Sequence, residues 1–495
     1  MPNYQKQLKM KQILTFLIFF SSLLSPLHSF AQNNIQRYIE NLKKDTLFIN
    51  SVTGIMVMDS KGKSIASWNP DMPLLTASTM KTVTTGIALK VLGPDFRFKT
   101  RLAHNGFIEN GVLYGNLFII GGGDPTLGSV DTLGIPVDTL FGQWKESLQK
   151  NGIRRINGHI VADDRFFEHE IVPTSWSWSN LGPSYGSGTS GLSFSENLQY
   201  FTFLPGINTG DAVIMKDHYP HIPGMNYKNN LLTGGSRTGN RSSYYVSDLS
   251  KDALFRGSLA SGSDSVLITV SNKFPHLSCA FEFREYLEKS GIYSKKEILD
   301  AKEFNAPGEY ELTMITETLS EPLYRIVNIT NRISNNFYAE TLLKMIGKKM
   351  TGTGSYDSAR VAVVRVLGEM DVPVRGFTQS DGSGLSRMNL VSPRFFCHYY
   401  AALEKSEVFP YFFNSLPVPG GPGTLKTVLQ NQDQKRKQRI HAKSGSLGNV
   451  RCYAGYVVRA NGEHLYFAIL ANNYPARTAQ MQVGIEGFMN ELTKY

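Results

Sequence analysis

The two ends of the chain share one hydrophobic pattern, an alternation of apolar and polar residues. Residues 54–71 alternate in this way on both sides of a polar turn at 59–62, which predicts a β-hairpin. Near the other end, alternating runs at 450–459 and 464–470 follow the segment 440–446. Their succession predicts antiparallel strands, with 440–446 as an edge strand.

Between these strands the apolar residues return every three or four positions, which is the spacing of a helix with a buried face. The helices expected from this spacing cover residues 80–92, 139–150, 281–289, 337–346 and 476–495, and Gly93 ends the first of them. Strands at the two ends with helices between them predict an α/β (α+β) fold, in which helices flank an antiparallel sheet.

The first 31 residues carry a different pattern. Three lysines precede a predominantly apolar run at 13–24, and Ser29-Phe30-Ala31 places small residues at positions −3 and −1 of a cleavage site. This pattern predicts a secretory signal peptide at 1–31 and a mature chain that is soluble in the periplasm. The cut is expected before Gln32, which is not a cysteine and so argues against a lipid anchor. No later apolar run reaches the ~20 residues of a membrane span.

Composition sets wide limits around this fold. With 495 residues, 41% of them apolar, the chain is long enough for two or more domains with ordinary cores. Its formal charge of +10 falls to +7 without the three signal lysines, and the basic cluster 435–439 forms either a weak contact with an anionic surface or a solvated loop. Three cysteines are too few for a disulfide scaffold, although the sequence allows one disulfide bridge. Export argues against a nucleic-acid partner, and no metal, nucleotide or other cofactor motif is complete.

Three short motifs follow one another in an order typical of serine enzymes that form an acyl intermediate. They are Ser78-Thr79-Met80-Lys81, Ser334-Asn335-Asn336 and Lys443-Ser444-Gly445. Single matches to the same patterns occur at 60/63, 147/150, 195/197 and 289–291. These lie in a predicted turn, late in or at the end of a helix, or away from any partner motif. Only the set that begins with Ser78 is complete and in order.

The residue types in these motifs suit acyl transfer. A serine hydroxyl needs a base within hydrogen-bond reach, and Lys81 lies one helical turn after Ser78. Ser78 is expected at a helix start, where its backbone N–H is free to bind an oxyanion. Asn336 has both a donor and an acceptor, which a substrate amide requires. The third motif combines a charge beside the nucleophile, a hydroxyl for a carboxylate and room for a substrate backbone, supplied by Lys443, Ser444 and Gly445.

The chain resembles the class C low-molecular-mass penicillin-binding proteins, the family of D-Ala-D-Ala carboxypeptidases and endopeptidases. The resemblance rests on the three motifs, on the stretches 121–127 and 381–387, and on the extension of the second motif to Glu340. It covers nearly the whole mature chain and implies a penicillin-binding/serine β-lactamase-like transpeptidase fold. Ser334 follows Ser78 by 256 positions, far more than in compact β-lactamases, so a large insertion is implied.

The resemblance also implies a domain division. The catalytic domain would be discontinuous, at 32–96 and 282–495, around one or two accessory domains at 97–281. Asn335 stands where an aspartate is commoner in this family, and Ser444 stands where threonine is. Ser444 keeps the hydroxyl of threonine, and we expect both variants to keep the needed chemistry.

The mechanism implied by the resemblance is a two-step acyl transfer on peptidoglycan stem peptides and D-Ala-linked cross-links, with β-lactams as further ligands and no cofactor. Ser78 would attack, and Lys81 would accept its proton, made less basic by partial burial and by the charge of Lys443. Ser334 would pass a proton to the leaving amine. The backbone amides of Ser78 and Ser446 would bind the oxyanion.

The implied substrate-binding residues are Asn336, Lys443, Ser444, Gly445, Ser446 and Asp163. Lys443 and Ser444 would hold the terminal carboxylate of the substrate. Asp163 either faces the cationic end of the diaminopimelate side chain or is an ordinary turn aspartate.

Two other functions stay open at this point. A serine β-lactamase shares the three motifs, although the long insertion argues for cell-wall processing. A wall-binding scaffold with a decayed site is an alternative of another class, and it predicts binding without acylation. The preference between carboxypeptidase and endopeptidase activity, the group that activates the deacylating water and the oligomeric state are left open by the sequence.

Overall fold

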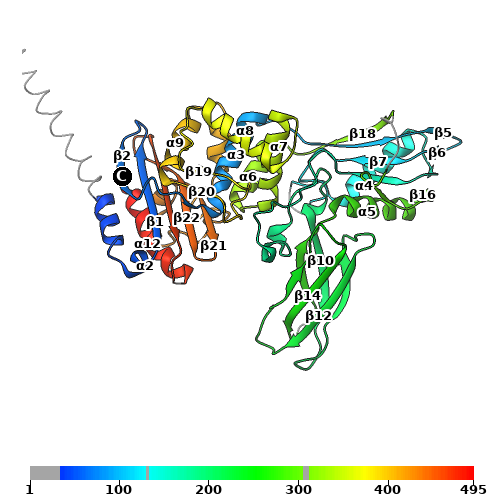
Figure 1. Ribbon diagram of the computed structural model, residues 1–495, viewed down its shortest axis with the longest axis horizontal. Helices are drawn as coiled ribbons and strands as arrows, with labels where there is room; N and C mark the ends of the chain where they lie inside the picture. Colours follow the sequence, from blue (N-terminus) through cyan, green and yellow to red (C-terminus); the bar gives the residue numbers. More distant parts are fainter. Residues whose placement is uncertain (1–33, 130–132, 263, 305–310, 476) are drawn as a thin grey trace, which may run out of the picture.

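The computed structural model describes residues 34–129, 133–262, 264–304, 311–475 and 477–495. The predicted signal peptide at 1–31 lies outside the described residues. Within these ranges, no helix combines the length and the apolar character that a membrane crossing needs. The molecule is elongated, with one large sheet at one end and several smaller sheets toward the other (Figure 1).

A five-stranded antiparallel sheet brings the two ends of the chain together. Its strand order is β2-β1-β23-β22-β21, and β1 (Val52–Asp59) pairs with β23 (His464–Asn472) along its whole length. The other strands are β2 (Ser64–Trp68), β22 (Val450–Val458) and β21 (Ile440–Leu447). The predicted hairpin and the predicted edge strand at 440–446 are therefore confirmed.

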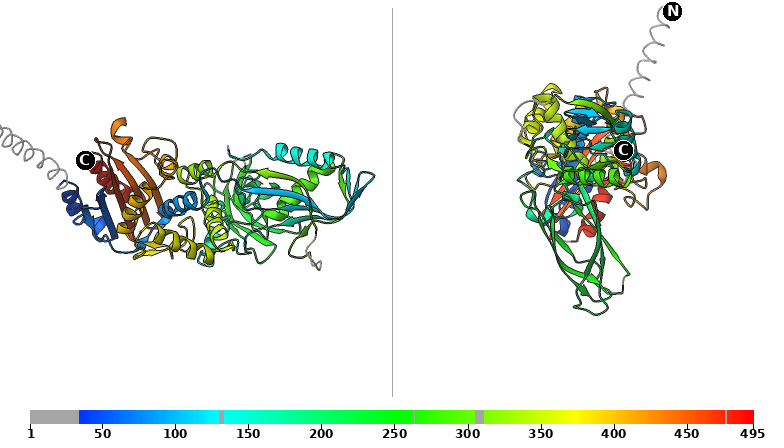
Figure 2. Two further views of the ribbon diagram at one scale, coloured as in Figure 1. Left: turned by 90° about the horizontal axis from the view of Figure 1, so that it is seen from above. Right: turned by 90° about the vertical axis from the view of Figure 1, so that its right-hand side faces the viewer.

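Helices cover both faces of this sheet, because its inner strands are apolar on both sides (Figure 1, Figure 2). On one face α12 (Thr478–Leu492) and α2 (Thr46–Ile49) share a core with the strands. On the other face α9 (Pro393–Glu404) contacts the sheet directly. Behind α9 lie α3 (Met80–Leu92) and α7 (Asn336–Thr351), which pack on each other. The helix predicted at 80–92 is confirmed, and Gly93 ends it.

Several shorter elements complete this catalytic part. They are β3 (Leu74–Leu75), α6 (Leu323–Arg332), α8 (Tyr356–Glu369), β19 (Phe377–Thr378), β20 (Leu390–Val391), α10 (Phe409–Ser415) and α11 (Gln434–Lys437). All three cysteines are buried and free, so the single disulfide bridge that the sequence allowed is not formed.

An accessory region is inserted between α3 and α6. Two of its sheets have the orders β17-β9-β7-β4-β18 and β16-β8-β6-β5, and two helices, α4 and α5, share a core with them. Two three-stranded sheets, β11-β10-β15 and β12-β14-β13, share a separate core and project away from the rest (Figure 1).

The bounds of the accessory elements follow the chain in order. They are β4 (Lys99–His104), β5 (Phe107–Glu109), β6 (Val112–Tyr114), β7 (Leu117–Ile120), α4 (Val137–Lys150), β8 (Arg155–Ile156), β9 (Ile160–Asp163), β10 (Leu198–Leu204), β11 (Ile214–Tyr219), β12 (Asn226–Gly234), β13 (Ser243–Tyr245), β14 (Asp252–Ala260), β15 (Val266–Ser271), α5 (Pro275–Lys289), β16 (Tyr293–Ser294), β17 (Leu299–Asp300) and β18 (Thr313–Leu319).

The accessory region was expected at 97–281, but three strands of its sheets, β16, β17 and β18, lie beyond residue 281. Residue 281 lies inside α5. Further along the chain, β18 pairs antiparallel with β4 and completes the five-stranded accessory sheet. We therefore propose that the accessory region extends to about residue 319.

Candidate active site

Ser78 lies in the tight turn that leads into α3. Residues Ala77–Thr79 form a single 3-10 turn, and α3 follows at once. Two glycines let other segments approach this turn closely. A Cβ on Gly384 would stand 1.8 Å from the Ala77 carbonyl oxygen, and a Cβ on Gly445 would stand 2.9 Å from the Ser78 nitrogen. A side chain at either position would push its segment away from the serine.

Lys81 reaches back from the first turn of α3 to Ser78. Its Nζ lies 3.0 Å from Ser78 Oγ, and it donates to Asn336 Oδ1 at 2.6 Å and to the Ser383 carbonyl oxygen at 2.8 Å. The Lys81 side chain is fully buried, whereas the sequence led us to expect partial burial.

The partners of Lys81 decide where its lone pair points. The Ser383 carbonyl and the Asn336 Oδ1 only accept hydrogen bonds, so each takes one N–H of the neutral amine. The lone pair then faces the hydroxyl of Ser78. Burial lowers the pKa of Lys81 to about 7, although two buried carboxylates oppose the shift. The neutral amine is therefore well populated near neutral pH.

The second motif sits at the start of α7. Ser334 has a left-handed backbone with a φ of 63°, and the side chain of Asn335 caps the helix by accepting a backbone N–H. Asn336 follows, and its Nδ2 donates to the Tyr185 carbonyl oxygen at 2.9 Å. Because a carbonyl only accepts, this bond turns the Asn336 Oδ1 toward Lys81.

Lys443 joins the third motif to the second. Its Nζ donates to Ser334 Oγ and to the Ser444 carbonyl oxygen, both at 2.9 Å. Burial first, and the nearby charge of Lys81 second, lower the pKa of Lys443 well below its usual range. The positive charge of Lys443 is thus least costly when an anion occupies the site.

The three motifs meet at one open cavity of about 670 Å³. The residues in or next to the motifs that line it are Ser78, Ser334, Asn335, Asn336 and, directly after the third motif, Ser446. Lys81 and Lys443 lie behind this surface as buried side chains that contact its serines. Ser444 and Gly445 are buried in β21 and do not line the cavity itself.

Much of the cavity wall comes from the accessory region, which the sequence analysis did not anticipate. The accessory residues that line it are Ser177, Ser179, Asn180, Ser184, Tyr185, Ser187, Glu196 and Leu198. All of them except Leu198, the first residue of β10, lie in a segment of short turns and irregular chain between β9 and β10, without a chemical motif. The only signal in the sequence was the density of glycine and serine at 182–191, which indicates a loop but not its location.

One unused motif match also reaches the cavity. Residues 195–197 form a turn with three successive left-handed residues, with φ angles of 52°, 54° and 53°. The turn is structural, as the sequence indicated, because Asn197 Nδ2 donates to the Gly188 carbonyl oxygen. Glu196 nevertheless lines the cavity and accepts a hydrogen bond from the Tyr338 hydroxyl at 3.1 Å. The turn thus connects the accessory wall to α7.

The stretch 381–387 is organised by the buried carboxylate of Asp381. This carboxylate accepts the backbone N–H groups of Gly384 and Ser386, at 2.7 and 2.6 Å. It also accepts the indole N–H of Trp176, from the accessory region, at 2.8 Å. The loop is therefore held both against the Ser78 turn and against the second wall of the cavity.

A second buried carboxylate, Glu340, supports the base from behind. It accepts the backbone N–H groups of Gly382 and Ser383, at 2.9 and 2.8 Å. The carbonyl of Ser383 in turn accepts from Lys81. Burial raises the pKa of Glu340 to about 8, and the nearby charge of Asp381 adds to the shift. In the sequence, Glu340 is only part of a stretch that resembles the family, and no role follows from it there.

The predicted site residue Asp163 lies away from the part of the structure where the three motifs meet. It ends β9 and lines a different cavity of about 490 Å³. Both of its carboxylate oxygens accept from the Arg165 guanidinium, at 2.8 and 2.6 Å. The arginine two residues later neutralises the charge that a cationic substrate group would need, and the sequence could not show that both side chains lie on the same side.

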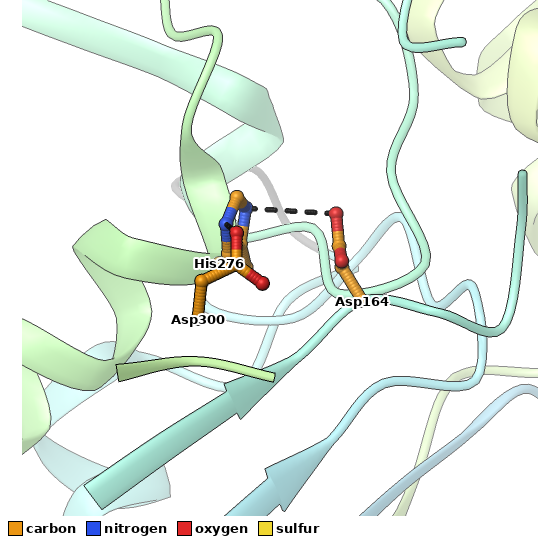
Figure 3. Close-up of side chains that lie close together, drawn as sticks. All are labelled: Asp164, His276 and Asp300. Atoms are coloured by element: carbon orange, nitrogen blue, oxygen red, sulfur yellow. Dashed lines mark hydrogen bonds and ion pairs between the residues drawn. The ribbon is translucent and has the colours of Figure 1, made fainter. Parts of the chain in front are cut away.

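A cluster of possible metal ligands lies in the accessory region rather than at the cavity. Among the described residues, Asp164, His276 and Asp300 bring one ligand atom each within 4.8 Å of the others (Figure 3). His276 Nε2 lies 3.0 Å from Asp300 Oδ2, and Nδ1 lies 3.7 Å from Asp164 Oδ2. The Lys302 ammonium, 2.8 Å from Asp164, already supplies a positive charge. We interpret the cluster as an ion-pair network that ties together the ends of β9, β17 and the start of α5.

Comparison with known proteins places this geometry in a family. The model of the D-Ala-D-Ala carboxypeptidase 3 (S13) family matches residues 35–492. The D-alanyl-D-alanine carboxypeptidase DacB of Haemophilus influenzae is 26% identical over 490 residues, which are 96% of this chain and 97% of that protein. The D-alanyl-D-alanine carboxypeptidase of Actinomadura sp. strain R39 is 26% identical over 448 residues, 88% of this chain and 80% of that protein.

Solved structures agree with the fold. The crystal structure of penicillin-binding protein 4 (dacB) from Haemophilus influenzae superimposes with a TM-score of 0.80 at 24% identity, and it covers 92% of this chain and 98% of its own. The same protein in complex with a novel β-lactam superimposes with a TM-score of 0.74 at 23% identity, with the same coverage. The predicted penicillin-binding-type α/β fold with inserted sheets is thereby confirmed.

Proposed function

The chain belongs to the D-Ala-D-Ala carboxypeptidase 3 (S13) family and is a serine-type D-Ala-D-Ala carboxypeptidase, and on this premise we propose that Ser78 is its nucleophile and Lys81 its general base. The contact between these two side chains carries the proposal. The neutral Lys81 amine has both N–H groups on carbonyl acceptors, so that its lone pair is left for the hydroxyl of Ser78.

In the acylation step, the Ser78 hydroxyl loses its proton to Lys81 Nζ as Oγ attacks the carbonyl carbon of the penultimate D-Ala. The oxyanion binds to the backbone N–H groups of Ser78 and Ser446, each worth about 3 kcal/mol in serine hydrolases. The C–N bond then breaks, and a proton passes through Ser334 to the leaving amine. Lys443 is hydrogen-bonded to Ser334 and keeps its hydroxyl oriented for this transfer.

Water then hydrolyses the ester between the acyl group and Ser78, which releases the shortened stem peptide and restores the serine. We place the terminal carboxylate of the incoming peptide near Lys443 and Ser444, whose positive charge and hydroxyl suit an anion. Gly445 lets β21 approach the Ser78 turn closely, which brings the neighbouring Ser446 to the substrate backbone, and Asn336 faces the substrate amide. Asp163 has no part in this scheme because Arg165 occupies its carboxylate.

The same site supports two extensions of this activity. The cavity of about 670 Å³ has two walls and is open, so we propose that it also admits D-Ala-linked cross-links and cleaves them as an endopeptidase. We propose further that β-lactams acylate Ser78, as supported by the complex of the Haemophilus influenzae protein with a β-lactam. The pattern of residues 1–31 supports a periplasmic location for these reactions.

The decisive experiment is intact mass spectrometry of the mature protein with benzylpenicillin, together with D-Ala release from a stem pentapeptide. We expect a persistent penicilloyl adduct and D-Ala release for the wild type, and neither for Ser78→Ala. Hydrolysed penicillin without a lasting adduct would favour a β-lactamase. Intact penicillin without an adduct, together with bound muropeptide, would favour a wall-binding scaffold.

A further inference from the structure

Lys273 is a buried lysine without a carboxylate partner. It lies between β15 and α5, and its side chain is 1% exposed. Its Nζ donates to the Gly186 carbonyl oxygen at 2.5 Å and reaches the Ser187 carbonyl oxygen at 3.4 Å. Among the described residues it forms no ion pair, and Asp248 favours its charge only from a distance. An ammonium buried without a counter-ion costs several kcal/mol, so this arrangement requires an explanation.

The carbonyls that Lys273 holds belong to the accessory wall of the cavity. Tyr185 and Ser187 both line the cavity, and Gly186 lies between them. The Tyr185 carbonyl accepts from Asn336 Nδ2, and the next carbonyl, that of Gly186, accepts from Lys273. Two successive carbonyls of one turn are therefore held by two different side chains.

The start of the same segment is fixed separately. The Ser271 N–H donates to the Gly182 carbonyl oxygen at 2.9 Å, and the Ser271 hydroxyl donates to the Leu181 carbonyl oxygen at 2.5 Å. These bonds pin the chain just before the turn. Lys273 reaches beyond them, to the two residues that follow Tyr185.

We propose that Lys273 is a positioning residue for the acylation of Ser78, acting through the turn at 184–187; this inference rests on the function proposed above. Its ammonium holds the Gly186 carbonyl, so that the Tyr185 carbonyl stays directed at Asn336 Nδ2. That bond keeps the Asn336 Oδ1 in hydrogen-bond contact with Lys81 Nζ. With Oδ1 in place, both N–H groups of the neutral Lys81 amine are occupied, and the lone pair faces the nucleophile.

Without Lys273, the turn is free to move and the Asn336 amide is free to rotate. An Asn336 NH₂ group turned toward Lys81 would compete for the lone pair that must receive the proton of Ser78. The expected defect is therefore in the chemical step and not in the initial binding of the acylating ligand.

A second buried lysine offers a matched control. Lys344 lies on α7, is also fully buried, and donates to the carbonyl oxygens of Glu168 and Glu170. These carbonyls are not among the residues that line the cavity. Lys344 thus resembles Lys273 in burial and in hydrogen bonding, but its bonds do not lead to Asn336.

The test measures acylation of the mature protein by a chromogenic cephalosporin in a stopped-flow instrument, which separates the acylation rate constant k2 from the dissociation constant Ks. For Lys273→Met we expect k2 to fall about tenfold, as the loss of one charged hydrogen bond implies, with Ks within about twofold of wild type. For Lys344→Met we expect k2 and Ks both within about twofold, with a comparable loss of thermal stability. Lys273→Gln, which keeps an uncharged NH₂ donor group, should have an intermediate k2.

The pH dependence distinguishes positioning from a purely structural role. Burial lowers the pKa of Lys273 to about 7, so the amine carries its charge, and makes its stronger hydrogen bonds, below that pH. The ratio of wild-type to Lys273→Met k2 should therefore be largest near pH 6 and should shrink above pH 8. The titration of Lys81 cancels in this ratio because both proteins contain it.

The inference is overturned if folded Lys273→Met, or Lys273→Gln where the methionine variant does not fold, keeps the wild-type k2. An equal fall of k2 in Lys344→Met, or a ratio that does not change with pH, would also overturn it. A wild type that is not acylated at all would overturn the proposed function of Ser78 itself, which is a separate and recognisable result.

Discussion

The two walls of the cavity around Ser78 are built in different ways. One wall carries the three motifs, and behind it lie three ionisable side chains, those of Lys81, Lys443 and Glu340, that are fully buried and hydrogen-bonded. The other wall consists mainly of polar residues and backbone from 177–187, in irregular chain of the accessory region, together with Glu196 and Leu198. Chemistry at Ser78 needs particular side chains at fixed distances, whereas the opposite wall needs a backbone that is held in place.

The two walls meet at Asn336. Its Oδ1 belongs to the chemical wall through Lys81, and its Nδ2 belongs to the accessory wall through the Tyr185 carbonyl. A second connection joins Trp176 of the accessory region to Asp381. Changes confined to the chemical wall should therefore abolish acylation, and changes at the connections should weaken acylation or stability in a graded way.

The largest effect is expected for Lys81→Met, which removes the base from the chemical wall. Acylation by benzylpenicillin should slow about 10²- to 10⁴-fold, the usual contribution of a positioned general base. Quenched-flow mass spectrometry of the adduct measures this rate. Lys90→Met, in the last turn of the same helix, is the control and should acylate at the wild-type rate. A Lys81→Met variant that is acylated at the wild-type rate would show that another group takes the proton of Ser78.

The second expected effect is the pH dependence of the wild type. Burial lowers the pKa of Lys81 to about 7, so below that pH the amine is protonated and cannot accept the proton of Ser78. The second-order acylation constant should rise about tenfold per pH unit below 7 and level off above it. Stopped-flow measurements from pH 5 to 9 test this, and the rise should be absent in Lys81→Met. A midpoint near pH 10 would contradict the assignment.

A smaller effect is expected where the walls are connected. Trp176→Phe removes the indole N–H that donates to the buried Asp381 carboxylate. The free energy of unfolding should fall by about 2 kcal/mol, as for the loss of a hydrogen bond to a charged group. Urea unfolding followed by circular dichroism measures the change. Trp178→Phe is the matched control, because Trp178 is 59% exposed and should change stability by less than about 0.5 kcal/mol.

The smallest effect is expected for Asn335→Asp, which restores the Ser-Asp-Asn form of the second motif. Aspartate caps a helix about as well as asparagine, and a negative charge at the start of α7 adds at most about 1 kcal/mol of stability. Acylation should stay within about threefold of wild type. In the neighbouring variant Asn336→Asp, by contrast, the new carboxylate cannot donate to the Tyr185 carbonyl, and acylation should fall about tenfold or more. Equal acylation rates in the two variants would contradict the different roles of Asn335 and Asn336.

Local patterns were sufficient to predict much of the catalytic part. The hairpin at 54–71, the helix after Ser78 and the edge strand at 440–446 follow from the spacing of apolar residues. The convergence of the three motifs followed from their order and residue types, and the structure brings Ser78, Lys81, Ser334 and Lys443 together. The spacing of one helical turn alone places Lys81 next to Ser78.

Other features depend on contacts between segments far apart in the chain. The depth at which Lys81 is buried comes from α7 and the 381–387 loop, neither of which is adjacent to it in sequence. The resemblance offered Asp163 either as a substrate ligand or as a turn aspartate, and the structure pairs it with Arg165 at a different cavity. The proposed extension of the accessory region to about residue 319 rests on the pairing of β18 with β4, which is a long-range contact.

Residues close in sequence determined the elements of this protein and the reactive pair in the first turn of α3, because helical and strand periodicity and a one-turn spacing act over a few residues. The tertiary structure decided which loop became the second wall, which lysines lost water and which carbonyls they hold. These properties depend on burial and on hydrogen bonds between distant segments. A pattern of residues along the chain contains no information about either.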